Sequence, residues 1–108
     1  MTDTEITRGT GNVFADLGFA DAAERQTKTR LAIALNHVIE ERALKQVAVA
    51  KLLGIPQPKV SALVNYRLDG FSVERLMAFI VALGRDVEII VRRQRSEDMG
   101  RLTVLEAA

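Results

Sequence analysis

The chain has no cysteine and no tryptophan, and His37 is its only histidine. Without cysteine there can be no disulfide, no thiolate nucleophile and no cysteine-based zinc or iron–sulfur site. A metal site would need partner ligands that His37 lacks, so we expect it to be a surface or partly buried helix residue. We expect no metal and no cofactor. Aromatic residues make up only 5% of the chain, so the core must consist mainly of leucine, isoleucine, valine and alanine.

Long apolar runs are also missing. No segment reaches the roughly 18 consecutive apolar residues that a membrane span requires. The first ten residues are polar and include Asp3 and Glu5, unlike a secretory signal. A chain of 108 residues is long enough for one modest core. We therefore expect a soluble, cytoplasmic protein with no membrane partner.

The chain is poor in the residues that catalysis needs. It has no cysteine nucleophile and no glycine-rich phosphate loop, and no paired carboxylates with a recognisable partner. We therefore expect that the protein is not an enzyme.

Negative charge is absent from one window of the sequence. Residues 42–68 contain five basic residues and no aspartate or glutamate, although the whole chain has a formal net charge of +1. A basic, acid-free window in a nearly neutral chain favours a local anionic partner. The alternative is chance clustering of charge on a solvated face.

Apolar periodicity predicts helices in the middle of the chain. We expect a first helix from a cap at Asp21 to about Arg42, a second over about 45–53, a third over about 57–65 and a fourth from a cap at Ser72 to Gly84. The apolar stripes of the first and fourth helices are Leu31, Ala34, Leu35, Val38 and Ile39, and Val73, Leu76, Phe79, Ile80 and Leu83.

The two ends of the chain differ from this helical middle. We expect residues 1–20 to form a tail or arm, in which 12–18 is a short strand or an extended segment. Residues 86–92 are rich in β-branched side chains and predict a strand, and residues 101–105 predict a weaker one. One or two strands are not stable alone. We therefore expect residues 86–108 to pair within this region, across a two-fold axis with a second subunit, or in both ways.

The stretch 46–65 carries the landmarks of a helix-turn-helix. Ala50 lies in the middle of a helix, where a small side chain lets the next helix cross closely. Gly54 lies where the chain must leave that helix, which usually requires a positive φ. Val60 and Leu63 are three residues apart and can both face the core. This orientation leaves the polar residues of the third helix on the outside.

These outward polar residues predict a DNA interface. Gln57 can read the edge of an adenine, and Lys59 can donate to guanine acceptors. Gln46 can bind a phosphate at the start of the second helix. The candidate DNA-binding residues are Lys45, Gln46, Gln57, Lys59, Ser61, Asn65 and Arg67.

The remaining candidates have less specific roles. Lys45, Asn65 and Arg67 suit contacts with the DNA backbone. Ser61 either touches a base or is simply a small exposed residue. The alternative for the whole stretch is a helical hairpin in a protein-binding domain that does not bind DNA.

The spacing of Gln46, Ala50 and Gly54, followed by Gln57, Val60 and Leu63, resembles the lambda-repressor-like (Xre) family of helix-turn-helix regulators. The resemblance covers about residues 28–84. It implies a mainly α fold, with a lambda-repressor-like helix-turn-helix domain of four to five helices over residues 21–85. A short C-terminal β-strand or hairpin over 86–108 would serve for dimerisation. Lys45 departs from the family pattern, which usually has a capping threonine or serine before the glutamine.

Longer motifs resemble the HigA-type antitoxins with an Xre domain. These motifs are residues 11–18, 54–61, 69–72 and 83–89. The resemblance implies a homodimer that binds double-stranded operator DNA and represses its own operon. It also implies a toxin partner, a ribonuclease of the HigB or RelE-like type. The alternative function is a protein-interaction module whose main role is to bind and neutralise that toxin.

Overall fold

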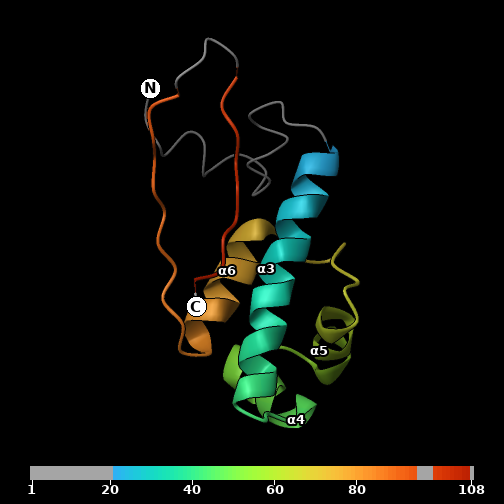
Figure 1. Ribbon diagram of the computed structural model, residues 1–108. Coiled ribbons are helices and arrows are strands. Elements are labelled where there is room, and N and C mark those ends of the chain that lie inside the picture. The colour runs from blue at the N-terminus through green and yellow to red at the C-terminus, as the bar shows by residue number, and fades with distance from the viewer. Residues whose placement is uncertain (1–20, 95–98, 108) are drawn as a thin grey trace.

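A computed structural model describes residues 21–94 and 99–107, and its helices carry the labels of Figure 1. The helices are α3 (Asp21–Glu41), α4 (Gln46–Leu53), α5 (Gln57–Val64) and α6 (Val73–Ala82). The four predicted helices are therefore confirmed, with ends that differ by one or two residues. The long helix α3 packs along α6, and α4 and α5 form a pair at its C-terminal end (Figure 1).

The core lies where the apolar stripes of α3 and α6 meet and extends under α4 and α5. The predicted stripes are confirmed: all their members are buried except Ala34, which is partly buried against the core. Leu35, Leu76 and Leu83 are completely buried. The buried apolar residues are Leu31, Ala32, Leu35, Val38, Ile39, Val49, Ile55, Val60, Leu63, Leu68, Phe71, Val73, Leu76, Phe79, Ile80 and Leu83.

The ends of α4 and α6 follow the local chemistry that the sequence indicated, whereas Asp21, predicted to cap the first helix, is the first residue of α3 itself. The Ser72 hydroxyl accepts a hydrogen bond of 3.1 Å from the Arg75 amide and caps α6. Gly54 ends α4 at a φ of 67°, and Gly84 follows α6 at a φ of 96°, both in the left-handed region. Lys45 precedes α4 without a side-chain cap.

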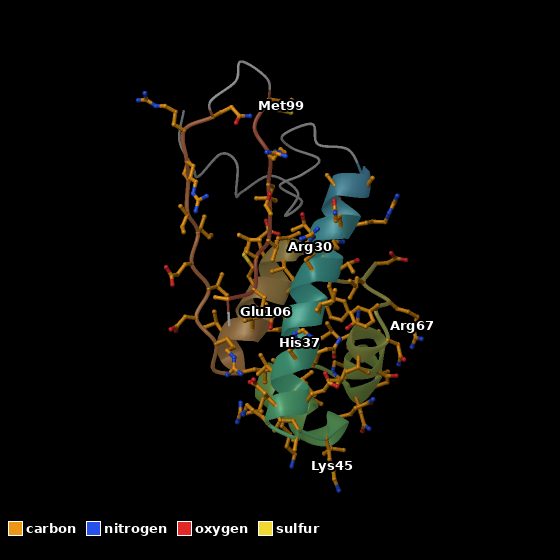
Figure 2. The ribbon with its side chains drawn as sticks, viewed as in Figure 1. Arg30, His37, Lys45, Arg67, Met99 and Glu106 are labelled. Carbon is orange, nitrogen blue, oxygen red and sulfur yellow. The ribbon has the colours of Figure 1, made fainter. Side chains whose placement is uncertain are left out.

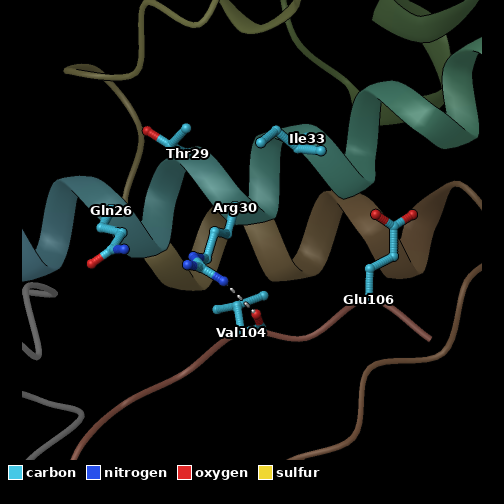
Figure 3. A pocket seen from close by; sticks show the side chains of 6 residues that line it. All are labelled: Gln26, Thr29, Arg30, Ile33, Val104 and Glu106. Carbon is cyan, nitrogen blue, oxygen red and sulfur yellow. Dashed lines mark hydrogen bonds between the residues drawn. The ribbon is translucent and has the colours of Figure 1, made fainter.

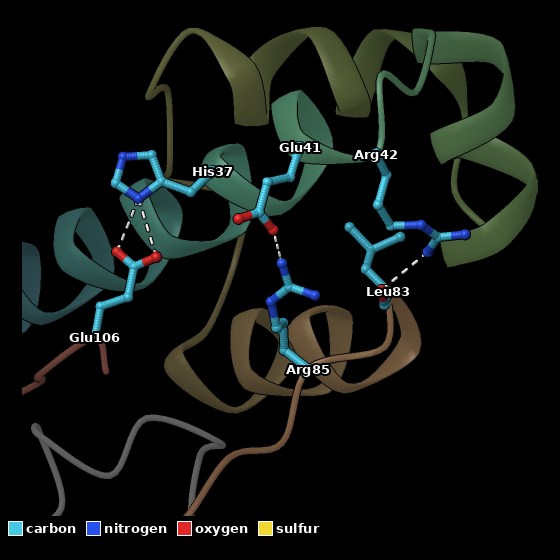
Figure 4. A network of polar contacts seen from close by, with 6 residues as sticks. All are labelled: His37, Glu41, Arg42, Leu83, Arg85 and Glu106. Atoms are coloured by element: carbon cyan, nitrogen blue, oxygen red, sulfur yellow. Dashed lines mark hydrogen bonds and ion pairs between the residues drawn. The ribbon is translucent and has the colours of Figure 1, made fainter. Parts of the chain in front are cut away.

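Two polar contacts tie the end of α6 to the end of α3 (Figure 4). The Arg42 guanidinium donates to the Leu83 carbonyl at 2.9 Å, and Arg85 forms an ion pair with Glu41. The Leu83 carbonyl belongs to the last turn of α6, where backbone acceptors lack an intrahelical partner. The contact therefore satisfies a helix end and holds the two helices together.

Residues 85–94 and 99–107 run as extended stretches after α6, drawn without strand arrows in Figure 1. The second stretch is held to α3 by a hydrogen bond of 2.9 Å from His37 Nδ1 to Glu106 (Figure 4). Arg30 also donates to the Val104 carbonyl at 3.5 Å, beside a pocket between α3 and this stretch (Figure 3). His37 is thus a surface helix residue.

The predicted strands over 86–92 and 101–105 are not present as strands in the described residues. A strand exists only through hydrogen bonds to a neighbouring strand, and the described part of this single chain pairs neither stretch. The predicted tail or arm over 1–20, with its segment 12–18, lies outside the described residues.

The matched valines of α4 give a test of this packing. Val49 is 0% exposed and Val47 is 53% exposed. We expect Val49→Ala to lower the free energy of unfolding by about 2 kcal/mol, because it removes two buried carbons and leaves a cavity. Val47→Ala should change it by less than about 0.5 kcal/mol. Urea denaturation measures both, and equal losses would contradict the orientation of α4.

Candidate nucleic-acid interface

Helices α4 and α5 meet at an angle typical of a helix-turn-helix. Three residues, 54–56, connect them, and the two axes are bent by 109°. Helix-turn-helix motifs join their helices at about 90–120° through a turn of three or four residues. No single helix in residues 21–94 and 99–107 is long and apolar enough to cross a membrane. Helices α4 and α5 reach that length and apolar content only when they are counted together across their bend.

The first turn of α5 is exposed, and the residues after it are buried or half-buried. Val60 and Leu63 are completely buried, as the sequence predicted, whereas Gln57 and Lys59 are exposed. Since α5 has only eight residues, these two buried side chains determine which way it faces. The helix therefore presents a polar side to solvent at its N-terminal end.

Prolines limit what the backbone of α5 can offer a ligand. Pro56 precedes the helix with a φ of −64°, and Pro58 lies in its first turn, so neither position has an N–H. The amides of Lys59 and Val60 both donate to the Pro56 carbonyl, at 2.9 and 3.3 Å. Within the first turn of α5, the Gln57 amide is the remaining donor. Recognition by this helix must therefore depend mainly on side chains.

The Lys59 ammonium is oriented by the turn that precedes α6. Its Nζ lies 5.4 Å from the ring centroid of Phe71, and a Cβ added to Gly70 would come within 3.0 Å of it. Phe71 is only 3% exposed and makes an edge-on contact with Phe79, with ring centroids 5.9 Å apart. A cation over an aromatic face at an exposed site is stabilised by about 0.5–1 kcal/mol. This small energy holds Lys59 in place but lets it move to a ligand.

Amide side chains close the other end of α5. Asn65 Nδ2 donates to the Ser61 carbonyl at 2.8 Å, and Asn36 Nδ2 of α3 donates to the Leu63 carbonyl at 3.5 Å. Both carbonyls also accept a backbone amide, Ser61 from Asn65 and Leu63 from Tyr66, each at 3.1 Å, so the side chains add a second donor to each. The Asn65 amide, predicted to contact the DNA backbone, is therefore already engaged and has one further N–H to offer.

The other predicted residues surround α4 and α5. Lys45 and Arg67 are exposed, and Gln46 and Ser61 are half-buried. Figure 2 shows Lys45 projecting at the end where α3 leads into α4, and Arg67 projecting beside α5. The structure therefore brings the predicted residues together on one helix pair, although they differ in how freely their side chains can reach a ligand.

Comparison with known proteins places this arrangement in a family. A family model described as a helix-turn-helix domain matches residues 13–92. A solved structure assigned to the XRE family of transcriptional regulators is similar, at 58% sequence identity and a TM-score of 0.76. The match covers 82% of this chain and 100% of that one. This chain belongs to the Xre-like helix-turn-helix family. Among proteins of curated function, none matches it.

The Xre-like family that residues 46–63 predicted is thus confirmed, and the HigA-type resemblance stays a prediction. In such a motif the second helix enters the major groove through its N-terminal residues. Here that helix is α5, and the residues at its start are Gln57 and Lys59. In the described residues no group of three or more histidine, cysteine or acidic side chains could hold a metal.

Sequence reasoning missed the residues that orient Lys59. It recognised residues 69–72 as a turn and a helix cap, but not that Gly70 leaves room for the ammonium and that Phe71 lies beneath it. A glycine followed by an aromatic residue, just after an exposed helix with a lysine, is the signal that could have been used.

Gly70→Ala gives a test of this orientation. Gly70 does not have a positive φ, so alanine fits its backbone, while the new Cβ would displace the Lys59 ammonium. The Lys59 Nζ lies over the Phe71 ring, so we expect the ring current to shift the NMR signals of the neighbouring ε-protons upfield. We expect these signals to move toward ordinary lysine values in Gly70→Ala. Gly100→Ala, which meets nothing within 4 Å, should leave them unchanged. Identical spectra for both variants would contradict the contact.

Proposed function

We infer that this protein is a sequence-specific transcriptional repressor that binds operator DNA as a homodimer, without chemistry of its own. The observation that carries the proposal is the exposure of Gln57 and Lys59 in the first turn of α5, a helix that the buried Val60 and Leu63 anchor. A helix anchored in this way can enter the major groove with its polar side chains free. Gln57 would read an adenine and Lys59 guanine acceptors.

The distribution of charge supports binding to a polyanion. All five basic residues of the acid-free window 42–68 are exposed. Lys45 and Gln46 lie at the start of α4, where the free amides of a helix N-terminus favour a phosphate. Arg67 lies beyond the end of α5 and suits a neighbouring phosphate. Such contacts supply affinity for any duplex, and its strength falls as salt rises.

A second copy is part of the proposal because one short helix reads few base pairs. Two recognition helices related by a two-fold axis would occupy successive major grooves about 34 Å apart. The operator should then be nearly palindromic.

The motifs at 54–61, 69–72 and 83–89 support a narrower proposal, since they resemble HigA-type antitoxins. In that case the operon would encode a RelE-like or HigB ribonuclease that this protein binds and neutralises. The test is co-expression with the product of a short, basic open reading frame adjacent to this one. Copurification of the two products and relief of growth arrest would support the antitoxin role. If the two products do not copurify and growth arrest is not relieved, the antitoxin role is overturned and transcriptional regulation alone remains.

The direct test of DNA binding is a mobility shift with the DNA upstream of this coding sequence. Measured at two salt concentrations, binding should weaken as salt rises and should exceed binding to a scrambled duplex. A folded protein that ignores duplex DNA at low ionic strength would overturn the proposal.

We expect Gln57→Ala to relax specificity at one base pair of each half-site. Loss of a bidentate contact to an adenine should weaken cognate binding by about 1–3 kcal/mol while leaving binding to scrambled DNA nearly unchanged. Gln26→Ala removes an exposed glutamine from α3 and should affect neither. Equal losses on cognate and scrambled sites would contradict the role given to Gln57.

We expect Lys45→Ala to act differently, because a phosphate contact carries no sequence information. Binding should weaken about equally for all sequences, and the slope of log affinity against log salt should become shallower by about 1. The control is Arg25→Ala, which removes an exposed charge from the first turns of α3. An unchanged salt slope in Lys45→Ala would show that this lysine does not contact a phosphate.

A further inference from the structure

Large apolar side chains are concentrated on the two extended C-terminal stretches, 85–94 and 99–107. Eleven large hydrophobic residues are exposed in the described part of the chain, and six of them lie here. A groove of about 640 Å³ runs between these stretches and helices α3 and α6. The six residues are Ile89, Ile90, Val91, Met99, Leu102 and Leu105.

The backbone N–H and C=O groups of these stretches also lack partners on a neighbouring strand in the part of the chain that the structure describes. Neither stretch takes part in a ladder within residues 21–94 and 99–107, so each presents a row of N–H and C=O groups. Extended, β-branched backbone of this kind is a template for pairing with another strand. A strand from another chain would therefore cover the apolar groove and pair with the free edges at the same time.

Residues 86–92 are complementary to themselves. If two copies pair antiparallel about Ile89, Val87 of one copy lies opposite Val91 of the other, and Ile89 lies opposite itself. Apolar pairs directly across two strands stabilise a sheet. A second copy of this chain can thus supply the missing strand.

One pair of opposite charges in this segment fits the same register. Asp86 lies opposite Arg92 of the second copy, and the two-fold axis repeats this pair of opposite charges. Arg85 would lie opposite Arg93, but its guanidinium is already paired with Glu41 of its own chain.

The position of Val87 favours this register over its neighbour. Val87 packs against the core, and strand alternation places residues 89 and 91 on the same face. A register centred on Ile90 would bring Arg93 opposite Val87, on this apolar face. The register centred on Ile89 keeps the middle of the face apolar over α3 and α6.

We propose that residues 86–92 of two copies pair antiparallel about a two-fold axis at Ile89, the strand of each copy lying along the groove of the other. The resulting four-stranded sheet would have 101–105 of each copy at its edges. The inference deepens the homodimer of the proposed function and rests on it, although it does not require DNA.

Single cysteines test the register, because the natural chain has no cysteine. A disulfide requires Cα atoms about 4.4–6.8 Å apart, which residues at a two-fold axis within a strand pair satisfy. We expect Ile89→Cys to form disulfide-linked dimers readily under mild oxidation, seen by non-reducing electrophoresis. Val91→Cys is the control. It would lie about 13 Å from its own copy in this register.

The Val91→Cys control is stringent because position 91 is more exposed than position 89. Val91 is 92% exposed and Ile89 is 77% exposed, so random collision would link Val91→Cys at least as fast. Faster linking of Ile89→Cys supports the proposal. Equal linking, faster linking of Val91→Cys, no linking of either, or a monomer by light scattering at micromolar concentration overturns it.

A charge exchange gives a second readout that needs no cysteine. Asp86→Arg and Arg92→Asp should each weaken the dimer, because each places like charges opposite one another. Both changes in one chain should restore it. Restored dimerisation supports the register, and a double variant weaker than either single variant overturns it.

The outcome can be separated from that of the proposed function. These measurements use the full chain without DNA. A dimer linked through Ile89→Cys that does not bind operator DNA would keep this interface and overturn the repressor. A monomer that still binds operator DNA would do the reverse.

Discussion

The buried face of α5 is the constraint on which the rest of the site depends. An isolated helix of eight residues is not stable in water, so α5 exists because Val60 and Leu63 are buried against the other helices. Full burial of such a side chain contributes about 1.5–3 kcal/mol. The two residues are three positions apart, on one side of the helix. Their burial anchors the helix, and Gln57 and Lys59 are exposed in the first turn, beside this buried pair.

The two ends of α5 differ in the polar groups that surround them. At its C-terminal end, Asn36 of α3 donates to the Leu63 carbonyl, and Asn65 donates to the Ser61 carbonyl within the helix end itself. At its N-terminal end, Pro56 and Pro58 fix the backbone and remove donors. The start of α5 is thus preorganised but chemically sparse. A ligand there meets one glutamine and one lysine rather than a row of amides, which favours recognition of specific groups over capture of any anion.

Local physics explains which features the sequence could predict. The helices, their caps and the buried stripes depend on residues three or four apart, on Ser72 as a cap and on Gly54 at a positive φ. The position of Lys59 depends instead on how α5 lies against Phe71, and such a contact is invisible until the helices are packed. The hydrogen bond from Asn65 to the Ser61 carbonyl was not predicted, for another reason. Its side chain has two competing partners, DNA and its own helix, and the sequence does not rank them.

The C-terminal stretches show a second limit of prediction from local sequence, because a strand depends on a neighbour that the local sequence does not contain. A helix satisfies its own backbone, so the pattern of residues 73–82 leads to a helix in a single chain. A strand needs a neighbouring strand, so the β-branched pattern of 86–92 predicts a preference that no neighbour satisfies in the described part of this chain. The local pattern and the unpaired segment do not conflict. Because Val87 packs on the core while Ile89 and Val91 stay exposed, the folded helices place this segment where the proposed second copy could pair with it.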